Sequence, residues 1–317
     1  MEGSSKQMTT VVQTPQNLLS KLSEYCKKNF QCFAEKPGLF WLRKIGRFEL
    51  IRNAISLLFQ RAENTYQLTQ AQPTIFQNVD VDAVVSGIKT DSYGVGVNLP
   101  PSVVKEIRDF ADSTLCFANR DSKLGFYYRE KEKAQAELGQ QIRLGSYLHN
   151  LKKCEVVKRL ETDPTLLAIA AKFLGAPPVH MATELWWSFP VEATLNDQLK
   201  AAQVYHYDLD DYRFIKFFFY LTDVDLSAGP HILIRGTHKN KTFFHQLLGL
   251  RCASKDDQEI VSCYGADKVV AICGEAGLGF AEDSTCFHKG TLPTSKERLL
   301  LQIEYSMNSY GEIRELD

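Results

Sequence analysis

Two histidines and an aspartate in the C-terminal part of the chain have the types and spacing of a metal site. His206 and Asp208 lie two residues apart in a segment expected to form a strand, and alternate strand residues share one face. His288 lies in a second short apolar segment. Two imidazoles and one carboxylate on one side of an ion form the triad that binds Fe(II) and leaves positions open for co-substrate and dioxygen.

An arginine follows at a spacing that adds to this pattern. Arg298 stands ten residues after His288, at the start of an apolar segment. Its planar guanidinium can bind a carboxylate through two parallel hydrogen bonds, as the far end of 2-oxoglutarate requires. A His-x-Asp triplet alone is weak evidence. The order triplet, histidine, arginine is more specific and predicts an Fe(II) site with 2-oxoglutarate as co-substrate.

A β-rich region must bring these distant residues together. From Val179 onward the helical period of apolar residues ends, and eight short strand-like segments follow, separated by turn residues; this is typical of a sandwich or jelly roll. The segments are 180–189, 202–208, 214–221, 231–235, 268–273, 277–281, 285–289 and 299–305. Helical patterns precede them at 79–88, 98–116 and 162–174. We predict a mainly β fold with flanking helices, built on a double-stranded β-helix (jelly-roll, cupin-like) core.

The N-terminal part of the chain differs in charge. Residues 1–63 carry ten Lys or Arg against five Asp or Glu, whereas the whole chain has 37 against 38. Apolar residues recur at helical spacing in 16–30 and 39–60. We predict a basic helical extension over 1–75 and a catalytic jelly-roll domain over 76–317. The helix at 39–60 is expected to pack its apolar stripe on the domain and leave its charges in solvent; a surface for a partner or for self-association is the alternative.

Composition excludes several classes of protein. With 317 residues, 44% of them hydrophobic, the chain is long enough to bury a sizeable core. Its balanced charge gives no reason to bind nucleic acid. Eight cysteines without a CxxC pair argue against a zinc ribbon and for a reducing compartment. The N-terminus is polar, and no uncharged apolar run approaches the roughly 20 residues of a membrane span. We expect a cytoplasmic protein without stable membrane insertion.

From about Val79 to Tyr305 the chain resembles the phytanoyl-CoA dioxygenase family of Fe(II)- and 2-oxoglutarate-dependent oxygenases. The motifs that carry the resemblance are Gly94-Val95-Gly96-Val97 with Leu99-Pro100, Phe173-Leu174-Gly175, His206-Tyr207-Asp208, the segment 216–225, Gly229-Pro230, Gly236-Thr237-His238-Lys239 and the segment 288–298. The resemblance implies that His206, Asp208 and His288 are the catalytic iron ligands and that Arg298 binds 2-oxoglutarate.

The resemblance also implies the chemistry. Fe(II), 2-oxoglutarate and O2 would oxidise one C–H bond of a substrate, with release of succinate and CO2, and hydroxylation is the simplest outcome. Halogenating relatives have a small residue where this chain has Asp208, which argues against halogenation. We expect a small organic metabolite as substrate, as in specialised-metabolite biosynthesis. The alternatives are an acyl-CoA, a side chain of a partner protein recruited through the N-terminal helices, and a non-catalytic jelly roll that binds metal for regulation.

Further residues are candidates for binding the co-substrate and the substrate. Several family members have a serine two residues after the distal histidine. Gly290 stands there in this chain, so Thr291 is expected to supply the hydroxyl to 2-oxoglutarate. Lys216, on the strand after the triplet, is expected to face the mouth of the jelly roll and to bind the co-substrate. The predicted substrate residues are Glu184, Trp186 and Ser188, which share one strand face, and Tyr212.

Overall fold

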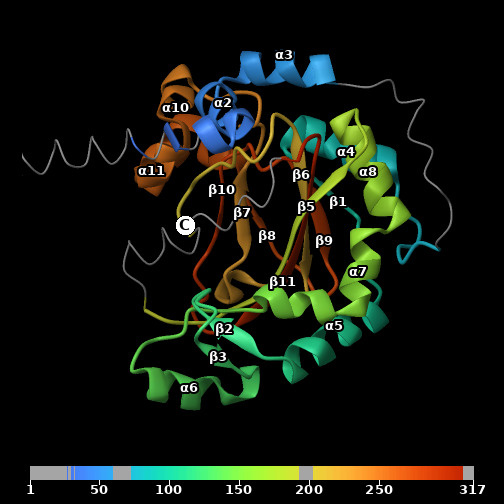
Figure 1. The fold of residues 1–317 in the computed structure, drawn as a ribbon, viewed down its shortest axis with the longest axis vertical. Helices are drawn as coiled ribbons and strands as arrows, with labels where there is room; N and C mark the ends of the chain where they lie inside the picture. Colours follow the sequence, from blue (N-terminus) through green and yellow to red (C-terminus); the bar gives the residue numbers. More distant parts are fainter. Residues whose placement is uncertain (1–26, 28–29, 32, 60–72, 193–202, 310–317) are drawn as a thin grey trace, which may run out of the picture.

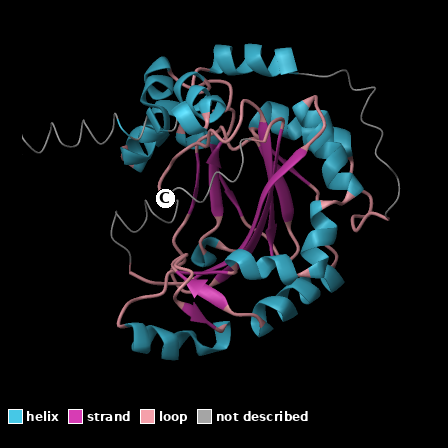
Figure 2. Cartoon of the chain, in the orientation of Figure 1, coloured by secondary structure: helices cyan, strands magenta, loops and turns pink. Residues whose placement is uncertain are grey.

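The computed structural model describes residues 27, 30–31, 33–59, 73–192 and 203–309, so the predicted helix at 16–30 lies almost entirely outside them. In these residues two antiparallel sheets face one another, and helices enclose them from outside (Figures 1 and 2). Apolar side chains between the two sheets form one cluster, and those between the large sheet and its helices form another. This is the predicted jelly roll with flanking helices.

The large sheet holds eight strands in the order β1-β9-β6-β11-β5-β4-β2-β3. Every neighbouring pair is antiparallel. The strands span, in chain order, Tyr93–Val95 (β1), Cys116–Ala118 (β2), Gly125–Phe126 (β3), Leu144–Ser146 (β4), Val179–Ser188 (β5), Phe214–Tyr220 (β6), Gly279–Glu282 (β9) and Arg298–Ser306 (β11).

The small sheet carries the second histidine of the predicted metal site. Its order is β10-β7-β8, with β7 at His231–Ile234, β8 at Val269–Ile272 and β10 at His288–Gly290. The strand predicted at 202–208 is reduced, in its described part, to a single bridge between His206 and His288. The chain leaves the sheet there because the Asp208 N–H bonds to the Ser284 carbonyl instead of continuing the ladder, at 2.9 Å.

Helices cover the outer face of the large sheet. Helix α8 begins where the sequence predicts, since the Asp163 carboxylate accepts from the Thr165 N–H at 2.8 Å, and it ends at Gly175 in a left-handed conformation. The helices over this face are α4 (Val81–Asp91), α5 (Pro101–Ser113), α7 (Glu155–Glu161) and α8 (Pro164–Leu174). Helix α6 (Lys131–Leu138) lies beside β2 and β3 (Figure 1).

The other end of the molecule has α10 (Phe243–Leu248) and α11 (Asp257–Tyr264), which lie near the small sheet (Figure 1). Short 3-10 helices complete the described elements, at Tyr128–Glu130 (η2), Leu148–Lys153 (η3), Leu226–Ala228 (η4), Gly249–Ser254 (η5) and Ala266–Lys268 (η6). Within the described ranges, no helix is both long and apolar enough to cross a bilayer.

Strands β6 and β11 are buried along their whole length because both of their faces are covered. In β6, Phe217 and Phe219 pack against the helices, whereas Phe218 and Tyr220 pack between the sheets. In β11 the same alternation turns Leu300 toward the small sheet. Arg298, Gln302 and Glu304 share that parity, so the interior face of β11 is mostly polar.

The single helix predicted at 39–60 is two helices, α2 (Pro37–Ile45) and α3 (Glu49–Phe59). Helix α2 ends at Gly46, whose N–H bonds to the Leu42 carbonyl at 2.8 Å. The predicted orientation of α3 is also wrong. Arg52 and Ser56 face the domain and are buried, whereas Leu50 and Leu58 are exposed. Polar contacts to main-chain carbonyls of the domain, rather than apolar packing alone, seat this helix.

Candidate active site

The fold brings the three predicted metal ligands together between the sheets. His206 and His288 exchange both main-chain hydrogen bonds across their bridge, at 2.9 and 3.0 Å. Ligand atoms of His206, Asp208 and His288 all lie within 4.8 Å of one another. The His288 Nε2 is 3.5 Å from Asp208 Oδ2, and the His206 Nε2 is 3.9 Å from Asp208 Oδ1. Donors this close can share one ion, and two imidazoles with one carboxylate are the donor set that suits iron.

The main chain orients both imidazoles. The Nδ1 of His206 lies 2.8 Å from the Val204 carbonyl, and the Nδ1 of His288 lies 3.0 Å from the Cys286 carbonyl. A carbonyl only accepts, so each Nδ1 is the protonated nitrogen and each Nε2 has its lone pair available for a metal. Burial and the neighbouring His206 lower the pKa of His288 to about 4. The imidazole is therefore neutral at pH 7, as a ligand must be.

Lys216 holds the carboxylate ligand. Its side chain is buried, and its Nζ lies 2.5 Å from Asp208 Oδ2 and 2.8 Å from Asp210 Oδ2, with Glu304 at 3.7 Å. Burial alone would raise the pKa of Asp208, but the Lys216 ammonium and the two imidazoles outweigh it and place that pKa well below its usual range. Three acidic side chains therefore surround the Lys216 ammonium. We predicted that Lys216 binds the co-substrate; in the structure its ammonium contacts these side chains.

Register explains why Glu304 belongs to this cluster. Lys216 on β6 stands directly opposite Glu304 on β11, and directly opposed residues project from the same face of a sheet. Burial raises the pKa of Glu304 well above its usual range, and nearby Asp210 and Asp208 add to the shift. The raised pKa favours the uncharged form of Glu304, which would reduce the negative charge around Lys216.

A second buried pair lies behind His288. Glu282 accepts from His231 Nε2 at 2.7 Å and from Ser284 Oγ at 3.0 Å, and its Oε1 is 3.5 Å from His288 Nδ1. Burial would raise the pKa of Glu282, but the two imidazoles outweigh it and lower that pKa to about 2. The His231 ring stacks on His288 with centroids 5.4 Å apart. Glu282 and His231 therefore help to hold the His288 ring in place.

Arg298 has a buried donor without a partner. Its Nη1 donates to the Gly229 carbonyl and its Nη2 to Ser188 Oγ at 3.4 Å. Its Nε is buried and makes no hydrogen bond with any described residue. An orphaned donor on a buried guanidinium is costly unless a ligand completes it. Arg298 therefore fits the distal carboxylate of 2-oxoglutarate.

Replacing Arg298 by methionine should weaken the binding of 2-oxoglutarate. A hydrogen bond to a charged group contributes about 1.5–3 kcal/mol, so the KM for 2-oxoglutarate is expected to rise about 10- to 100-fold. The affinity for the metal alone should stay unchanged. Anaerobic titration of the Fe(II)-loaded protein with 2-oxoglutarate measures the first quantity, and equilibrium dialysis measures the second. Equal losses of 2-oxoglutarate affinity and metal affinity would show that the variant misfolds. Arg298→Lys, which keeps the positive charge, separates misfolding from a specific loss of 2-oxoglutarate binding.

The other predicted residues are placed unevenly. Trp186 packs against the apolar cluster between the sheets. Glu184 accepts from Arg120 Nη2 at 3.2 Å, and Ser188 contacts Arg298 as described. Thr291 donates its hydroxyl to the Pro230 carbonyl at 2.7 Å, which engages the donor that we expected 2-oxoglutarate to use. Tyr212, predicted as a substrate residue, packs with two leucines of α2.

Sequence reasoning missed two polar side chains that line the interior. Gln302 lies on the polar face of β11, between Leu300 and Glu304, and its Nε2 is buried without a partner. Ser146 on β4 stands opposite Trp186, and its Oγ is also buried without a partner among the described residues. A signal for Gln302 is present in the sequence. Polar residues recur at even positions of the otherwise apolar segment 298–306.

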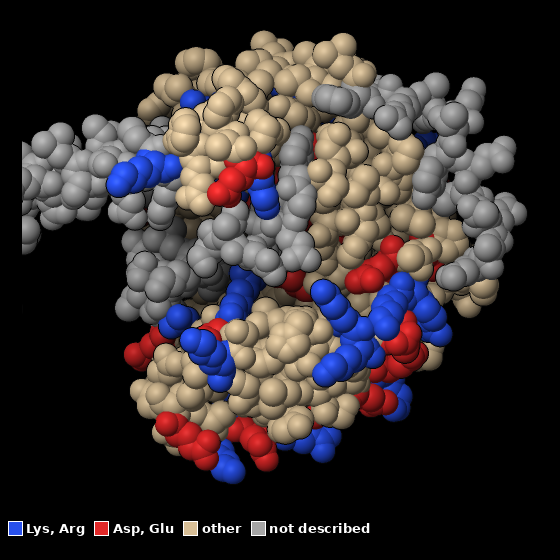
Figure 3. All heavy atoms as spheres, viewed as in Figure 1, with Lys and Arg blue, Asp and Glu red and all other residues tan. Residues whose placement is uncertain are grey.

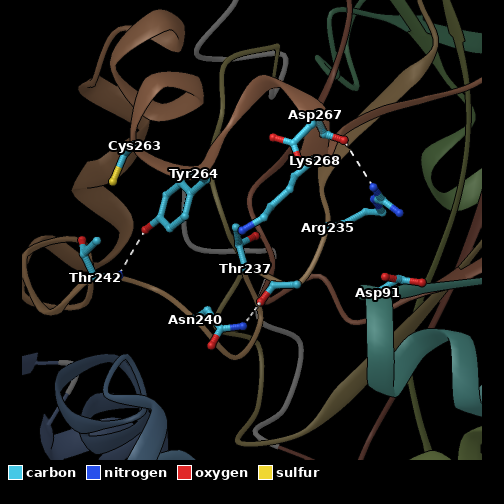
Figure 4. A pocket seen from close by; sticks show the side chains of 10 residues that line it. Asp91, Arg235, Thr237, Asn240, Thr242, Cys263, Tyr264, Asp267 and Lys268 are labelled. Atoms are coloured by element: carbon cyan, nitrogen blue, oxygen red, sulfur yellow. Dashed lines mark hydrogen bonds between the residues drawn. The ribbon is translucent and has the colours of Figure 1, made fainter.

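A hollow of about 520 Å³ opens elsewhere on the surface, between the end of α4 and α11 (Figure 4). None of the three ligands lines it. Arg235, Thr237 and Lys268 belong to its wall (Figure 4). Thr237 also supports the metal site from behind, since its Oγ1 accepts from the Phe287 N–H at 2.8 Å. Two aspartates and two basic residues share the wall, so the hollow has no net charge preference.

The chain matches one protein family and is similar to several solved structures. The model of the family "Phytanoyl-CoA dioxygenase (PhyH)" matches residues 94–298, which is more than half of the chain. No curated protein sequence matches the chain. Solved structures with a similar fold include HygX from Streptomyces hygroscopicus with nickel and 2-oxoglutarate bound, at 14% identity and a TM-score of 0.49 over 70% of this chain and 85% of that one.

Two further solved structures match at the same level. The alpha-ketoglutarate-dependent epimerase SnoN from nogalamycin biosynthesis has 16% identity and a TM-score of 0.48 over 71% of this chain and 82% of its own. EctD from S. alaskensis with bound Fe has 16% identity and a TM-score of 0.48 over 74% and 82%. The family match spans the three predicted metal ligands and Arg298. The chain therefore belongs to the phytanoyl-CoA dioxygenase family and is an Fe(II)- and 2-oxoglutarate-dependent oxygenase.

Proposed function

We propose that this oxygenase hydroxylates an unactivated C–H bond of a small organic metabolite, with His206, Asp208 and His288 as iron ligands and Arg298 as the 2-oxoglutarate-binding residue. The observation that supports the proposal best is the pairing of two features in one interior. One is a set of three potential ligand side chains whose remaining polar atoms are already held by hydrogen bonds. The other is a buried guanidinium with an unpaired N–H. A jelly roll that only binds metal has no need of the second.

The residues of this chain have separate tasks in the reaction. When bound, Fe(II) with 2-oxoglutarate and O2 supplies the oxidant for the C–H bond, and succinate and CO2 are released. Lys216 fixes the orientation of the Asp208 carboxylate. Arg298 binds and orients the co-substrate. The aromatic side chains Phe218, Tyr220 and Phe280, which pack between the sheets, exclude water from the reacting bond.

Gln302 is placed to bind the co-substrate as well. A co-substrate that extends from Arg298 toward the ligands passes Gln302, because Gln302 stands on the same strand face between Arg298 and Glu304. Its buried amide N–H then finds an acceptor in a carboxylate or keto oxygen. An unpartnered amide lowers stability when no ligand is bound. The unpaired amide therefore does not stabilise the fold, and we assign it to binding the co-substrate.

Replacing Gln302 by leucine is expected to raise the KM for 2-oxoglutarate about tenfold, the effect of one hydrogen bond to a charged group. The melting temperature of the ligand-free protein should stay the same or rise, because the variant no longer buries an unpaired amide. Steady-state kinetics and thermal unfolding measure the two quantities. Gln258→Leu, on the exposed face of α11, is the matched control. A large fall in melting temperature with unchanged kinetics would contradict this role.

The proposed function has a direct test. Anaerobic protein with Fe(II) should develop a weak visible charge-transfer absorbance when 2-oxoglutarate is added. In air, it should form succinate slowly without substrate and faster with one. A panel of small metabolites, acyl-CoA thioesters and peptides is then screened for the gain of one oxygen atom by mass spectrometry. Absence of both the absorbance and succinate would disprove the proposal, and oxidation of thioesters or peptides alone would replace the metabolite by that substrate class.

A further inference from the structure

Helix α3 exposes three leucines and buries two polar residues. Leu50, Leu57 and Leu58 are 85%, 63% and 83% exposed, whereas Arg52 and Ser56 are 4% and 1% exposed. The Arg52 Nη2 donates to the His238 carbonyl at 2.9 Å, and the Ser56 Oγ donates to the Tyr212 carbonyl at 3.2 Å. A helix that served only to cover its own domain would present the opposite faces. The leucine face of α3 is therefore directed at something outside the described part of the chain.

The exposed apolar surface continues from α3 onto neighbouring elements. Phe48 stacks on Phe243 of α10 with ring centroids 6.1 Å apart, and Arg47 Nη1 donates to the Leu247 carbonyl at 2.8 Å. Eleven of the fifteen large hydrophobic residues that are exposed in the described chain belong to this end. We call them the apolar cap: Phe30, Phe33, Trp41, Leu50, Ile51, Leu57, Leu58, Phe243, Phe244, Leu247 and Leu250.

The cap lies at an outer edge of the molecule. Helix α3 forms the upper margin of the view in Figure 1, and Figure 3 shows almost no charged atoms in the described part of that margin. Single exposed apolar residues are normal on a protein surface, but a gathering of this size marks a site of interaction. The side chains project from helices at the molecular edge, a shape that suits a flat or yielding partner.

Basic side chains border the cap. Lys44 lies 5.4 Å from the Phe40 ring, and the Arg47 guanidinium lies 5.1 Å from the Phe48 ring. Lys255 lies 5.4 Å from the Phe244 ring and also pairs with Glu259 at 2.8 Å. Residues 33–59 hold five Lys or Arg, of which Arg52 is buried, against two Asp or Glu, in a chain whose net charge is −1. Leucine and aromatic side chains bordered by Lys and Arg are the composition of helices that lie in the interface of an anionic bilayer.

We propose that the apolar cap docks this enzyme on the surface of an anionic lipid bilayer. The leucines of α3 and the phenylalanines of α10 enter the boundary between headgroups and acyl chains, and the positive charge of the bordering residues attracts the anionic headgroups. The attachment is peripheral, since it uses short helices lying along the surface. Attraction by basic groups decreases with salt, whereas burial of apolar surface does not. Docking is therefore partly salt-sensitive.

Vesicle sedimentation of the full-length protein tests the proposal. Wild type should sediment with vesicles of phosphatidylcholine and phosphatidylserine, and less with phosphatidylcholine alone. The double variant Leu57→Glu/Leu58→Glu should bind at least about tenfold more weakly, while its succinate formation without vesicles stays that of wild type. Leu226→Glu is the matched control, because Leu226 is equally exposed, at 72%, but lies outside the cap.

Fluorescence adds a second readout. Trp41 belongs to the cap and is half exposed, so acyl chains carrying bromine should quench part of the tryptophan emission, and Trp41→Phe should remove that part. Wild type that remains in solution with both kinds of vesicle overturns the proposal. Light scattering that shows a dimer, dissociated by Leu57→Glu/Leu58→Glu, without vesicle binding also overturns it, since the cap would then join two copies of this chain.

Discussion

Replacing His288 by alanine is expected to weaken metal binding by more than about 100-fold, beyond the loss that changes around the ligands cause, and to reduce succinate formation to background. His288 is buried, neutral at pH 7, and positioned by the Cys286 carbonyl, so no neighbouring imidazole can replace it. His231 is the nearest candidate, but it is held by Glu282 at 2.7 Å. Equilibrium dialysis with Co(II), followed by visible absorption, measures the affinity.

The control for this variant is His180→Ala. His180 is exposed on β5, where its Nε2 lies 2.8 Å from the Thr183 hydroxyl and 3.8 Å from the Glu161 carboxylate. That variant should bind metal as wild type does. If His288→Ala retained wild-type affinity while His206→Ala lost it, His288 would not be a ligand, and the second group of potential ligands, which also contains His288, would be excluded with it.

Replacing Lys216 by methionine is expected to lower the free energy of unfolding of the metal-free protein by about 3–5 kcal/mol, the cost of breaking a buried ion pair from one side. The variant leaves Asp208 and Asp210 without their cation in a buried environment. It should also weaken metal binding about 10- to 100-fold, since an outer residue that orients a ligand has an effect of that size. Urea unfolding and equilibrium dialysis measure the two quantities.

Two further variants separate the role of Lys216 from a general loss of packing. Lys216→Met combined with Asp210→Asn removes one of the unpaired charges and should recover part of the stability. Lys296→Met breaks an exposed pair with Asp225 and should change little, because solvent screens such pairs. Full stability with full metal affinity in Lys216→Met would contradict the role given to this residue.

The candidate metal site could be proposed from sequence because most of its pattern is local. His206 and Asp208 share a face by alternation, and the arginine follows the second histidine at a short spacing. The network around Lys216 could not be predicted, since it depends on which strands are neighbours. Glu304 reaches Lys216 only because β11 pairs with β6 in one register, and a slip by one residue would turn its side chain toward the helices.

The orientation of helix α3 cannot be predicted from sequence either, for a related reason. Period 3.6 predicts that one face of residues 39–60 is apolar but not which way that face points. The direction follows from main-chain carbonyls of the domain that happen to be available, such as those of Tyr212 and His238. The burial of Tyr212 is unpredictable for the same reason, because helix α2 covers it.

The hydrogen bond from Ser56 to the Tyr212 carbonyl joins α3 to the segment that carries Asp208. Only three residues separate Asp208 from Tyr212, so the seating of α3 and the geometry of the ligand share one stretch of backbone. Two equilibria that share a structural element are linked, and the linkage is reciprocal. If metal binding orders that stretch, it strengthens the seating of α3 by some factor. Detaching α3 from the domain would then weaken iron binding by that same factor.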